Sequence, residues 1–284
     1  MDQRSMPTMR SKRLGNELRR LRRAKGLTVS EAAIRLGCGQ SKISQIENGK
    51  RGIRPADLTA LLDLYDVTDE GRRRSIKQLA RDIHKVDWWT SEGPLTGSTL
   101  TDYLTLEVDS ELIRTYESTV IPGLLQAESY IRQVITPANC GDEAEARIQA
   151  RLKRKELLDG YPALQMSFII DQLALHRIQG SHEVISEQLH HLIDMGHHPN
   201  VMLQVLPLKA DLPPRQYVPF SLARYRGESS LEVVWLEHTN GGTLLEQDHD
   251  VRIYMQVWAE LTAAALSPAD SRSFLRELVK EYVP

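Results

Sequence analysis

The chain has 284 residues, of which 41% are hydrophobic and 26% charged, so it can bury a sizeable core and its length favours two domains over one. Its formal net charge of −2 hides an uneven distribution. Residues 1–86 contain 20 Lys and Arg against 10 Asp and Glu, a net charge of +10, whereas residues 87–284 carry −12. A basic segment joined to an acidic remainder predicts that the first part meets a polyanion and that the second does not.

Cysteine usage and hydropathy exclude two classes of protein. Cys38 and Cys140 are the only cysteines, too few for a disulfide framework, and they indicate a reducing compartment. No apolar run approaches the ~20 residues that a membrane span needs. The first ten residues carry charge without the apolar segment of a secretory signal. The sequence therefore predicts a cytoplasmic protein without a membrane anchor.

Residues 11–86 are predicted to form one all-α domain of five short helices, after a disordered N-terminus over residues 1–10. Apolar residues recur at helical spacing from Leu14, which predicts the first helix. A Thr-x-x-Glu capping box at Thr28 begins the second helix. The remaining helices are expected over about residues 40–47, 55–65 and 69–84.

The second and third helices, joined by Gly37-Cys38-Gly39, have the features of a helix-turn-helix. Ala33 is small enough for a close helix crossing, and Gly37 tolerates the positive φ of a tight turn. Ile43 and Ile46 supply an apolar anchoring face. The opposite face carries amides, hydroxyls and one cation, namely Gln40, Ser41, Lys42, Ser44 and Gln45.

Amide, hydroxyl and cationic side chains read base edges and phosphates, so this face predicts binding to double-stranded DNA. A generic helical hairpin would rarely combine it with a net charge of +10. Glutamine can pair with adenine N6 and N7 in the major groove, which makes Gln40 and Gln45, with Ser41 between them, the predicted base readers. The predicted phosphate and backbone contacts are Lys42, Ser44, Asn48, Lys50, Arg51 and Arg54. A homodimer is expected, because one recognition helix covers only a few base pairs.

Residues 87–102 are rich in Gly, Pro, Ser and Thr and are predicted to be a linker to a second domain over residues 103–284. Helical and strand patterns alternate there, which predicts an α+β domain with a sheet of about four or five strands covered by helices. Helices are expected over residues 103–117, 123–135, 143–158, 247–265 and 268–282. Strands are expected over residues 164–171, 200–208, 217–225 and 231–238, the last turning at 240–242.

The segment Pro122-Gly123-Leu124-Leu125-Gln126 has two interpretations. It can start a helix whose backbone N–H groups face a pocket or a partner surface. Alternatively, Leu124 and Leu125 fill the core, which is the more ordinary role of an apolar pair after a turn. We therefore regard the segment as a candidate partner or ligand site.

Residues 13–66 resemble the phage-repressor-like (XRE) helix-turn-helix family, whose Ser-x-Ile-Glu-Asn-Gly ending is matched by residues 44–49. In that family an arginine of the first helix pairs with a glutamate of the recognition helix. The resemblance implies that Arg22 and Glu47 form this structural pair. The family often has a phosphate-binding glutamine early in the second helix, but this chain has Val29 there, and Ser30 is the candidate to replace the contact.

Residues 115–135, 150–158, 200–208 and 265–278 resemble the C-terminal domain of unknown function in WhiJ-type actinobacterial regulators. The most specific signature of that domain is residues 122–126. The resemblance implies an antitoxin-like regulator of development or antibiotic production. It also implies a very small partner protein, encoded by a neighbouring gene, that the regulator binds.

Three functional hypotheses follow. The favoured one is a sequence-specific DNA-binding transcriptional regulator controlled through its second domain by a small partner protein. The second has the same regulator bind a small molecule in that domain. The third is an enzyme with Asp171, Glu237 and His238 in a pocket at the sheet edge. The sequence lacks the G-x-S-x-G, P-loop and H-E-x-x-H motifs, so we predict no enzymatic activity and no cofactor.

Two further chemistries were weighed against ordinary structural roles. Cys38, in the turn, is interpreted as a small packing residue rather than a redox switch. Four histidines in one segment invite a metal site, but the two pairs lie about two helical turns apart, without Cys or carboxylates at ligand spacing. They are interpreted as a solvated helix end, and no metal is predicted; the four are His190, His191, His197 and His198.

Overall fold

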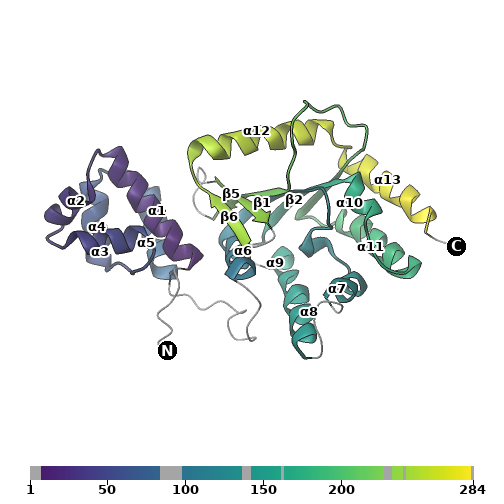
Figure 1. The fold of residues 1–284 in the computed structure, drawn as a ribbon, viewed down its shortest axis with the longest axis horizontal. Coiled ribbons are helices and arrows are strands. Elements are labelled where there is room, and N and C mark those ends of the chain that lie inside the picture. Colours follow the sequence, from purple (N-terminus) through teal and green to yellow (C-terminus); the bar gives the residue numbers. More distant parts are fainter. Residues whose placement is uncertain are drawn as a thin grey trace. The chain divides into compact units, whose positions relative to one another are not determined.

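The computed structural model describes residues 8–83, 98–135, 142–160, 163–226, 232–238 and 241–282 (Figure 1). The chain divides into two compact units, residues 1–88 and 89–284, which are treated separately below. Within the described residues, no helix is both long enough and apolar enough to span a bilayer.

The first unit has the five predicted α-helices. They are α1 (Met9–Ala24), α2 (Val29–Arg35), α3 (Gln40–Glu47), α4 (Pro55–Leu64) and α5 (Glu70–Asp82). The capping box of α2 is formed: the Glu31 N–H donates to Thr28 Oγ1 at 3.2 Å, and the Thr28 N–H donates to Glu31 Oε2 at 2.7 Å. One apolar core joins the helices, and Leu18, Ala32 and Leu62 at its centre are fully buried.

The first helix begins earlier than predicted. Thr8 is its N-cap, with Oγ1 accepting from the Ser11 N–H, and Met9 and Arg10 are buried. The prediction of disorder over residues 1–10 is therefore wrong for residues 8–10, because a cap and a buried first turn compensate for a polar sequence. Residues 1–7 lie outside the described residues.

Helices α1 and α3 approach so closely that glycine is required at their contact. A Cβ on Gly15 would lie 2.6 Å from the carbonyl oxygens of Ile46 and Glu47. Gly49 follows α3 with a φ of 68°, and its backbone passes α1 at Lys12. The Lys50 N–H donates to the Gln45 carbonyl at 2.9 Å, which completes a Schellman cap on α3.

The second unit contains a mixed six-stranded sheet, so the α+β prediction is confirmed but the predicted number of strands was too low. The strands are β1 (Ser110–Glu117), β2 (Gln165–Asp171), β3 (Val201–Leu206), β4 (Phe220–Tyr225), β5 (Glu232–His238) and β6 (Gly241–Leu245). Their order is β3-β2-β1-β4-β5-β6. β1, β2 and β3 are parallel, and β4, β5 and β6 continue the sheet in antiparallel pairs.

The predicted helix over residues 103–117 is wrong in its second half. Helix α6 spans Ser98–Asp109, and the chain then continues directly as the central strand β1. Ile113, Thr115 and Tyr116 are buried there, and β-branched and aromatic residues favour a strand when both neighbours are strands. The predicted linker also ends too late, because residues 98–102 belong to α6; its residues 87–97 lie outside the described ones.

Helices cover both faces of the sheet (Figure 1). They are α7 (Glu128–Ile135), α8 (Asp142–Arg154), α9 (Glu156–Asp159), α10 (Gln172–His176), α11 (His182–Met195), α12 (Asp248–Ala264) and α13 (Pro268–Lys280). On one face, Trp258 and Leu261 of α12 pack against Tyr116 of β1. Side chains alternate along a strand, so Thr115 and Glu117 of β1 point to the opposite face, which α6 covers.

Candidate nucleic-acid interface and a cavity in the second unit

A tight turn sets the direction of α3. Gly37 has a φ of 68°, as predicted, and the Cys38 N–H donates to the Ala33 carbonyl at 2.9 Å. Ala33 is buried where α2 packs against α3, which fits its predicted role at the crossing. The turn therefore fixes α3 against α2 through backbone geometry and small side chains.

Helix α3 presents a polar face and buries an apolar one. Ile43 and Ile46 are buried, whereas Gln40, Ser41 and Gln45 are exposed. The side chains of Ser41 and Gln45 make no hydrogen bond with any described residue. Exposed amide and hydroxyl groups on a rigidly anchored helix are suited to reading base edges in a major groove.

Gln40 differs from the other predicted base readers. Its Nε2 donates to Ser30 Oγ at 2.7 Å, which joins the start of α3 to the first turn of α2. Ser30 is the residue that the sequence suggested in place of the missing phosphate contact at Val29. The two predicted contacts therefore lie side by side, and one hydrogen bond orients both side chains.

A buried ion pair fixes the inner side of α3. Arg22 Nε and Nη2 donate to the two carboxylate oxygens of Glu47 at 2.6 and 2.9 Å, and the side chains are only 8% and 4% exposed. The hydrogen bonds that Arg22 donates to Glu47 raise the pKa of the guanidinium, against the opposing effect of burial. A third bond, from Arg22 Nη1 to the Leu27 carbonyl at 2.6 Å, secures the α1–α2 connection.

A second arginine, which the sequence did not reveal, holds the end of α3. Arg19 Nη2 donates to the Glu47 carbonyl at 2.9 Å and to Asn48 Oδ1 at 2.6 Å. Asn48 Nδ2 in turn donates to the Ser44 carbonyl at 2.7 Å. The Asn48 side chain, a predicted backbone contact, is therefore engaged in closing the helix.

A small basic cavity lies beside α3, at the start of α4. It has a volume of about 290 Å³, and Lys42, Arg51, Arg54 and Asp57 line it. Lys42 Nζ donates to Asp57 Oδ2 at 2.7 Å, so this predicted phosphate contact already has an anionic partner. Arg51 and Arg54 are exposed, as is Lys50. Arg54 is the N-cap residue of α4, but its side chain makes no capping hydrogen bond. The backbone N–H groups at the start of α4 can therefore donate to a phosphate oxygen.

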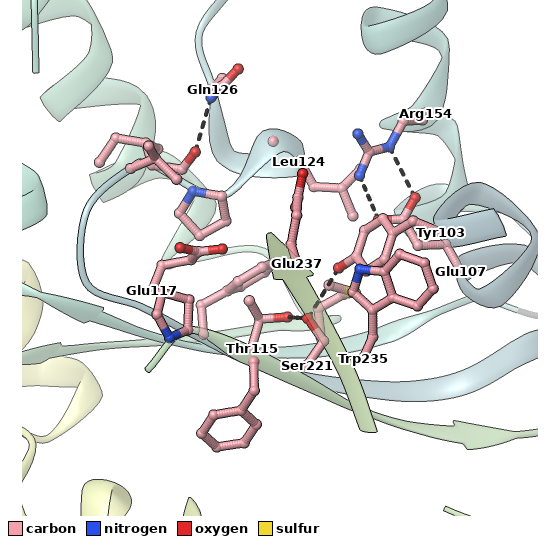
Figure 2. A pocket seen from close by; sticks show the side chains of 18 of the residues that line it. Tyr103, Glu107, Thr115, Glu117, Leu124, Gln126, Arg154, Ser221, Trp235 and Glu237 are labelled. Carbon is pink, nitrogen blue, oxygen red and sulfur yellow. Dashed lines mark hydrogen bonds and ion pairs between the residues drawn. The ribbon is translucent and has the colours of Figure 1, made fainter. Parts of the chain in front are cut away.

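A larger cavity of about 640 Å³ lies in the second unit (Figure 2). It opens at the sheet edge where β1 ends, β4 begins and β5 ends, on the face that α6 and α8 cover. Glu117, Ser221 and Trp235 come from these three strands, while Tyr103 of α6 and Arg151 of α8 complete the wall. The cavity thus assembles from segments far apart in the sequence.

The candidate segment 122–126 forms part of this cavity. Only Gly123–Leu125 is helical, as one 3-10 turn, so the predicted continuous helix over residues 123–135 is interrupted before α7. Leu124 and Leu125 are buried, in agreement with the core interpretation. Gln126 donates to the Ile121 carbonyl at 2.9 Å and accepts from Arg151 Nη1 at 2.9 Å. The segment therefore offers its side chains to the cavity wall rather than to an outer surface.

A buried ion pair stands at one wall of the cavity. Arg154 donates to the two oxygens of Glu107 at 2.6 and 2.9 Å, and the side chains are 7% and 1% exposed. Burial opposes the charge of Arg154, but Glu107 outweighs it and raises the pKa of the guanidinium. The Arg154 guanidinium also lies 5.7 Å from the centre of the Tyr103 ring.

Among the described residues, the carboxyl groups of Glu117 and Glu237 in this cavity form no such ion pair with an arginine. Burial, and next the charge of Glu237, raise the pKa of Glu117 to about 8. Burial lowers the pKa of Arg151 to about 10, with a further contribution from the charge of Arg154. Glu237 is exposed at the cavity rim. The raised pKa of Glu117 thus favours the protonated form of its carboxyl group.

The structure separates the residues of the enzyme and metal hypotheses. Asp171 caps α10, accepting from the Leu173 N–H at 2.8 Å, and does not line the cavity with Glu237 and His238. Two of the four histidines contact side chains outside the group: His191 contacts Lys155, and His198 contacts Asp159. Among the described residues, no group of three His, Cys, Asp or Glu side chains is placed to hold a metal ion.

Both units match known protein families, and two relatives are similar to part of the chain. The family described as "Helix-turn-helix domain" matches residues 13–75. The uncharacterized HTH-type transcriptional regulator RghRB of Bacillus subtilis (strain 168) is 46% identical over 57 residues, which are 20% of this chain and 41% of that protein. The HTH-type transcriptional repressor RghR of the same organism is 41% identical over 58 residues, 20% of this chain and 43% of the repressor.

The similarity to these two relatives thus spans less than half of their length. No solved structure matches the chain. The family described as "Domain of unknown function (DUF5753)" matches residues 100–277, which include every residue that lines the larger cavity. The chain therefore belongs to the family defined by this domain of unknown function.

Proposed function

We propose that the protein is a sequence-specific DNA-binding transcriptional regulator whose helix α3 enters the major groove. The observation that carries the proposal is the polar outer face of α3, held by the buried isoleucines and the Arg22–Glu47 pair behind it. The helix-turn-helix match over residues 13–75 and the regulators named among its relatives support the same function. The basic charge of residues 1–86 suits a polyanionic partner.

Base reading and backbone contact fall to different residues in this proposal. Gln45 and Ser41 are exposed and make no side-chain hydrogen bond with any described residue, so they meet base edges; Gln40 does so beside Ser30. Arg51, Arg54 and Lys50 lie after α3 and meet phosphates, together with the N-terminus of α4. Lys42 reaches a phosphate only when it leaves Asp57.

Two single substitutions test this division. Gln45→Ala is expected to relax the preference at particular base pairs by ~1–3 kcal/mol, because a base-edge contact is lost, while most non-specific affinity stays. Arg51→Ala serves as the matched control: it should weaken binding to all sequences alike and reduce the slope of affinity against salt by about 1. Selection from a randomised DNA pool measures both. An unchanged base preference for Gln45→Ala would show that α3 is docked differently.

The regulator is proposed to bind DNA as a homodimer. One recognition helix reaches only a few base pairs, and twofold symmetry doubles the contacts. Two protected half-sites about one helical turn apart in a footprint would support this. A single short protected site, together with a monomeric mass for the complex, would contradict it.

Control through the second unit has two candidate forms. The resemblance of residues 115–135 to antitoxin-like regulators favours a small protein partner, and the net charge of −12 over residues 87–284 suits a basic one. The cavity of about 640 Å³ favours a small molecule, because the signature residues Pro122, Gly123, Leu124 and Gln126 line it. Co-purification with the small protein encoded by a neighbouring gene, using a Leu124→Ala variant as the control for the cavity, separates the two forms. A complex that survives this substitution supports a protein bound elsewhere on the second unit.

A further inference from the structure

We infer that the cavity of the second unit binds a small organic amine, with its ammonium group between Glu117 and Glu237 and its body against Trp235 and Tyr103 (Figure 2). The inference concerns the second unit alone and does not depend on DNA binding by the first.

The size and the wall of the cavity fit a small organic molecule. Its volume of about 640 Å³ is within the usual range for ligand sites, ~300–1,000 Å³. Phe168, Trp235 and Tyr103 supply aromatic surface, and polar groups are interspersed among them. Aromatic surface beside polar and charged groups suits a compact ligand that has both an apolar body and a charged group.

The two carboxyl groups of the cavity, those of Glu117 and Glu237, indicate a positively charged ligand. Among the described residues, the Glu117 carboxyl group has no hydrogen bond or ion pair, and the charge of a second carboxylate, Glu237, raises its pKa further. A carboxyl group in such surroundings ionises readily only when a cation or a hydrogen-bond donor compensates its charge. An organic ammonium group between the two carboxyl groups supplies both a positive charge and hydrogen-bond donors.

The cationic side chains of the cavity do not fill this role. Arg154 of α8 is bonded to Glu107 of α6, and Arg151 donates to the neutral Gln126 side chain. Arg151 also feels the charge of Glu237, which limits the positive potential that it adds. The remaining titratable groups at this wall are Tyr103 and the exposed His238 at the rim.

Trp235 provides an independent argument that this wall binds a ligand. Its side chain is buried, with 4% exposed, yet the indole Nε1 has no hydrogen-bond partner in the part of the chain that the structure describes. Buried tryptophan N–H groups usually have one. The Tyr103 ring lies 5.8 Å from the indole, and the hydroxyls of Tyr103, Ser221 and Thr115 are linked at 3.2 and 3.0 Å. A ligand with an aromatic body and a hydrogen-bond acceptor therefore suits this wall.

Isothermal titration of the full-length chain tests the inference with three probes that share one phenol body. Tyramine carries the amine, 4-ethylphenol lacks it, and 3-(4-hydroxyphenyl)propionate replaces it with a carboxylate. Tyramine is expected to bind at least about tenfold more tightly than either of the others, because a charge-assisted contact is lost in both. Equal or tighter binding of 4-ethylphenol or the propionate would overturn the inference.

Proton release gives a second readout. An ammonium beside Glu117 favours its ionised form, so tyramine should release a proton from a group whose pKa is about 8. Titrations at neutral pH in phosphate and in Tris should therefore give different apparent enthalpies. Tyramine binding without proton exchange would place the amine away from Glu117 and overturn the assignment.

Substitutions locate the site. Glu117→Gln and, separately, Glu237→Gln should weaken tyramine binding about tenfold or more. Glu277→Gln is the matched control, because this exposed carboxylate on α13 pairs with Lys280 and lies outside the cavity wall. If Glu117→Gln fails to fold, the exposed Glu237 still allows the test. Unchanged tyramine affinity in Glu237→Gln, or an equal loss in Glu277→Gln, would contradict the proposed site.

The amine can come from a free molecule or from the amino terminus of a peptide. The peptide Tyr-Gly-Gly and its N-acetylated form distinguish these sources. Tighter binding of tyramine supports a free amine, and tighter binding of the unmodified peptide supports a chain terminus. Acetylated peptide that binds as well as the unmodified one would contradict recognition of an ammonium group.

Discussion

A buried bidentate arginine–glutamate pair is found in each unit of the protein, and the two pairs have different surroundings. Arg22–Glu47 lies behind α3, beside the apolar core of the first unit, and the three hydrogen bonds of Arg22 include one to the backbone of the adjacent loop. Arg154–Glu107 lies at the wall of a cavity. The first pair supports a surface whose polar groups point outward, whereas the second borders a space whose polar groups point inward.

This difference indicates where each unit meets its partner. The outward face of α3 suits a large and regular polyanion, because its side chains are exposed on a rigid helix. The inward-facing carboxylates and indole of the second unit suit a compact ligand. A buried arginine–glutamate pair thus supports an exposed helix face in the first unit and a cavity wall in the second.

The largest expected effect comes from breaking the first pair. Glu47→Ala leaves Arg22 buried without its anion, which should lower the free energy of unfolding of the first unit by ~3–5 kcal/mol. Calorimetry of the full chain should show the loss in one transition only. Glu70→Ala, which removes an exposed carboxylate 3.8 Å from Arg73 Nε, is the control and should change stability by no more than ~1 kcal/mol. A Glu47→Ala variant with the melting temperature of the wild type would contradict the stabilising role of the Arg22–Glu47 pair.

A pH dependence should distinguish the second unit from the first. The pKa of Glu117 is about 8 in the folded chain against an ordinary 4.5, so the folded state holds a proton that the unfolded state has lost between these values. The stability that this proton provides is present below about pH 4.5 and is lost as the pH rises through about 8. Glu117→Gln should flatten this decline, as measured by denaturant unfolding at several pH values. An identical decline in the variant would contradict the raised pKa.

The smallest expected effect concerns the rim of α3. Asp57→Asn removes the anionic partner of Lys42 and leaves its charge for a phosphate. Binding should strengthen for all DNA sequences, and the slope of affinity against salt should steepen by about 1. Asp63→Asn, in an exposed pair with Arg73, is the control and should leave the slope unchanged. A change in base preference for Asp57→Asn would mean that Lys42 reads bases instead.

The first unit was largely predictable because its signals are local. Apolar spacing, the capping box at Thr28 and the glycine at position 37 determine the helices and the turn within a few residues of each other. The Arg22–Glu47 contact followed only from a family resemblance. Gly15 and Arg19 were missed, because only the packed structure shows which backbone they approach.

The cavity was much less predictable. Residues 122–126 and Glu237 were candidates from the sequence, but Glu117 was hidden in a segment with helical spacing that forms the central strand. Trp235 looked like an ordinary strand residue, and nothing local marks a tryptophan whose N–H lacks a partner. Sites built by pairing distant strands depend on the register of the sheet, which periodicity does not determine.

The most direct test of the central claim is binding of the full-length protein to DNA from upstream of its own gene, compared with a scrambled duplex, at two salt concentrations. The outward-facing α3 predicts tighter binding to the upstream DNA by a factor of ~10³ or more, with affinity that falls steeply as salt rises. Equal and weak binding to both duplexes at both salt concentrations would contradict a sequence-specific regulator.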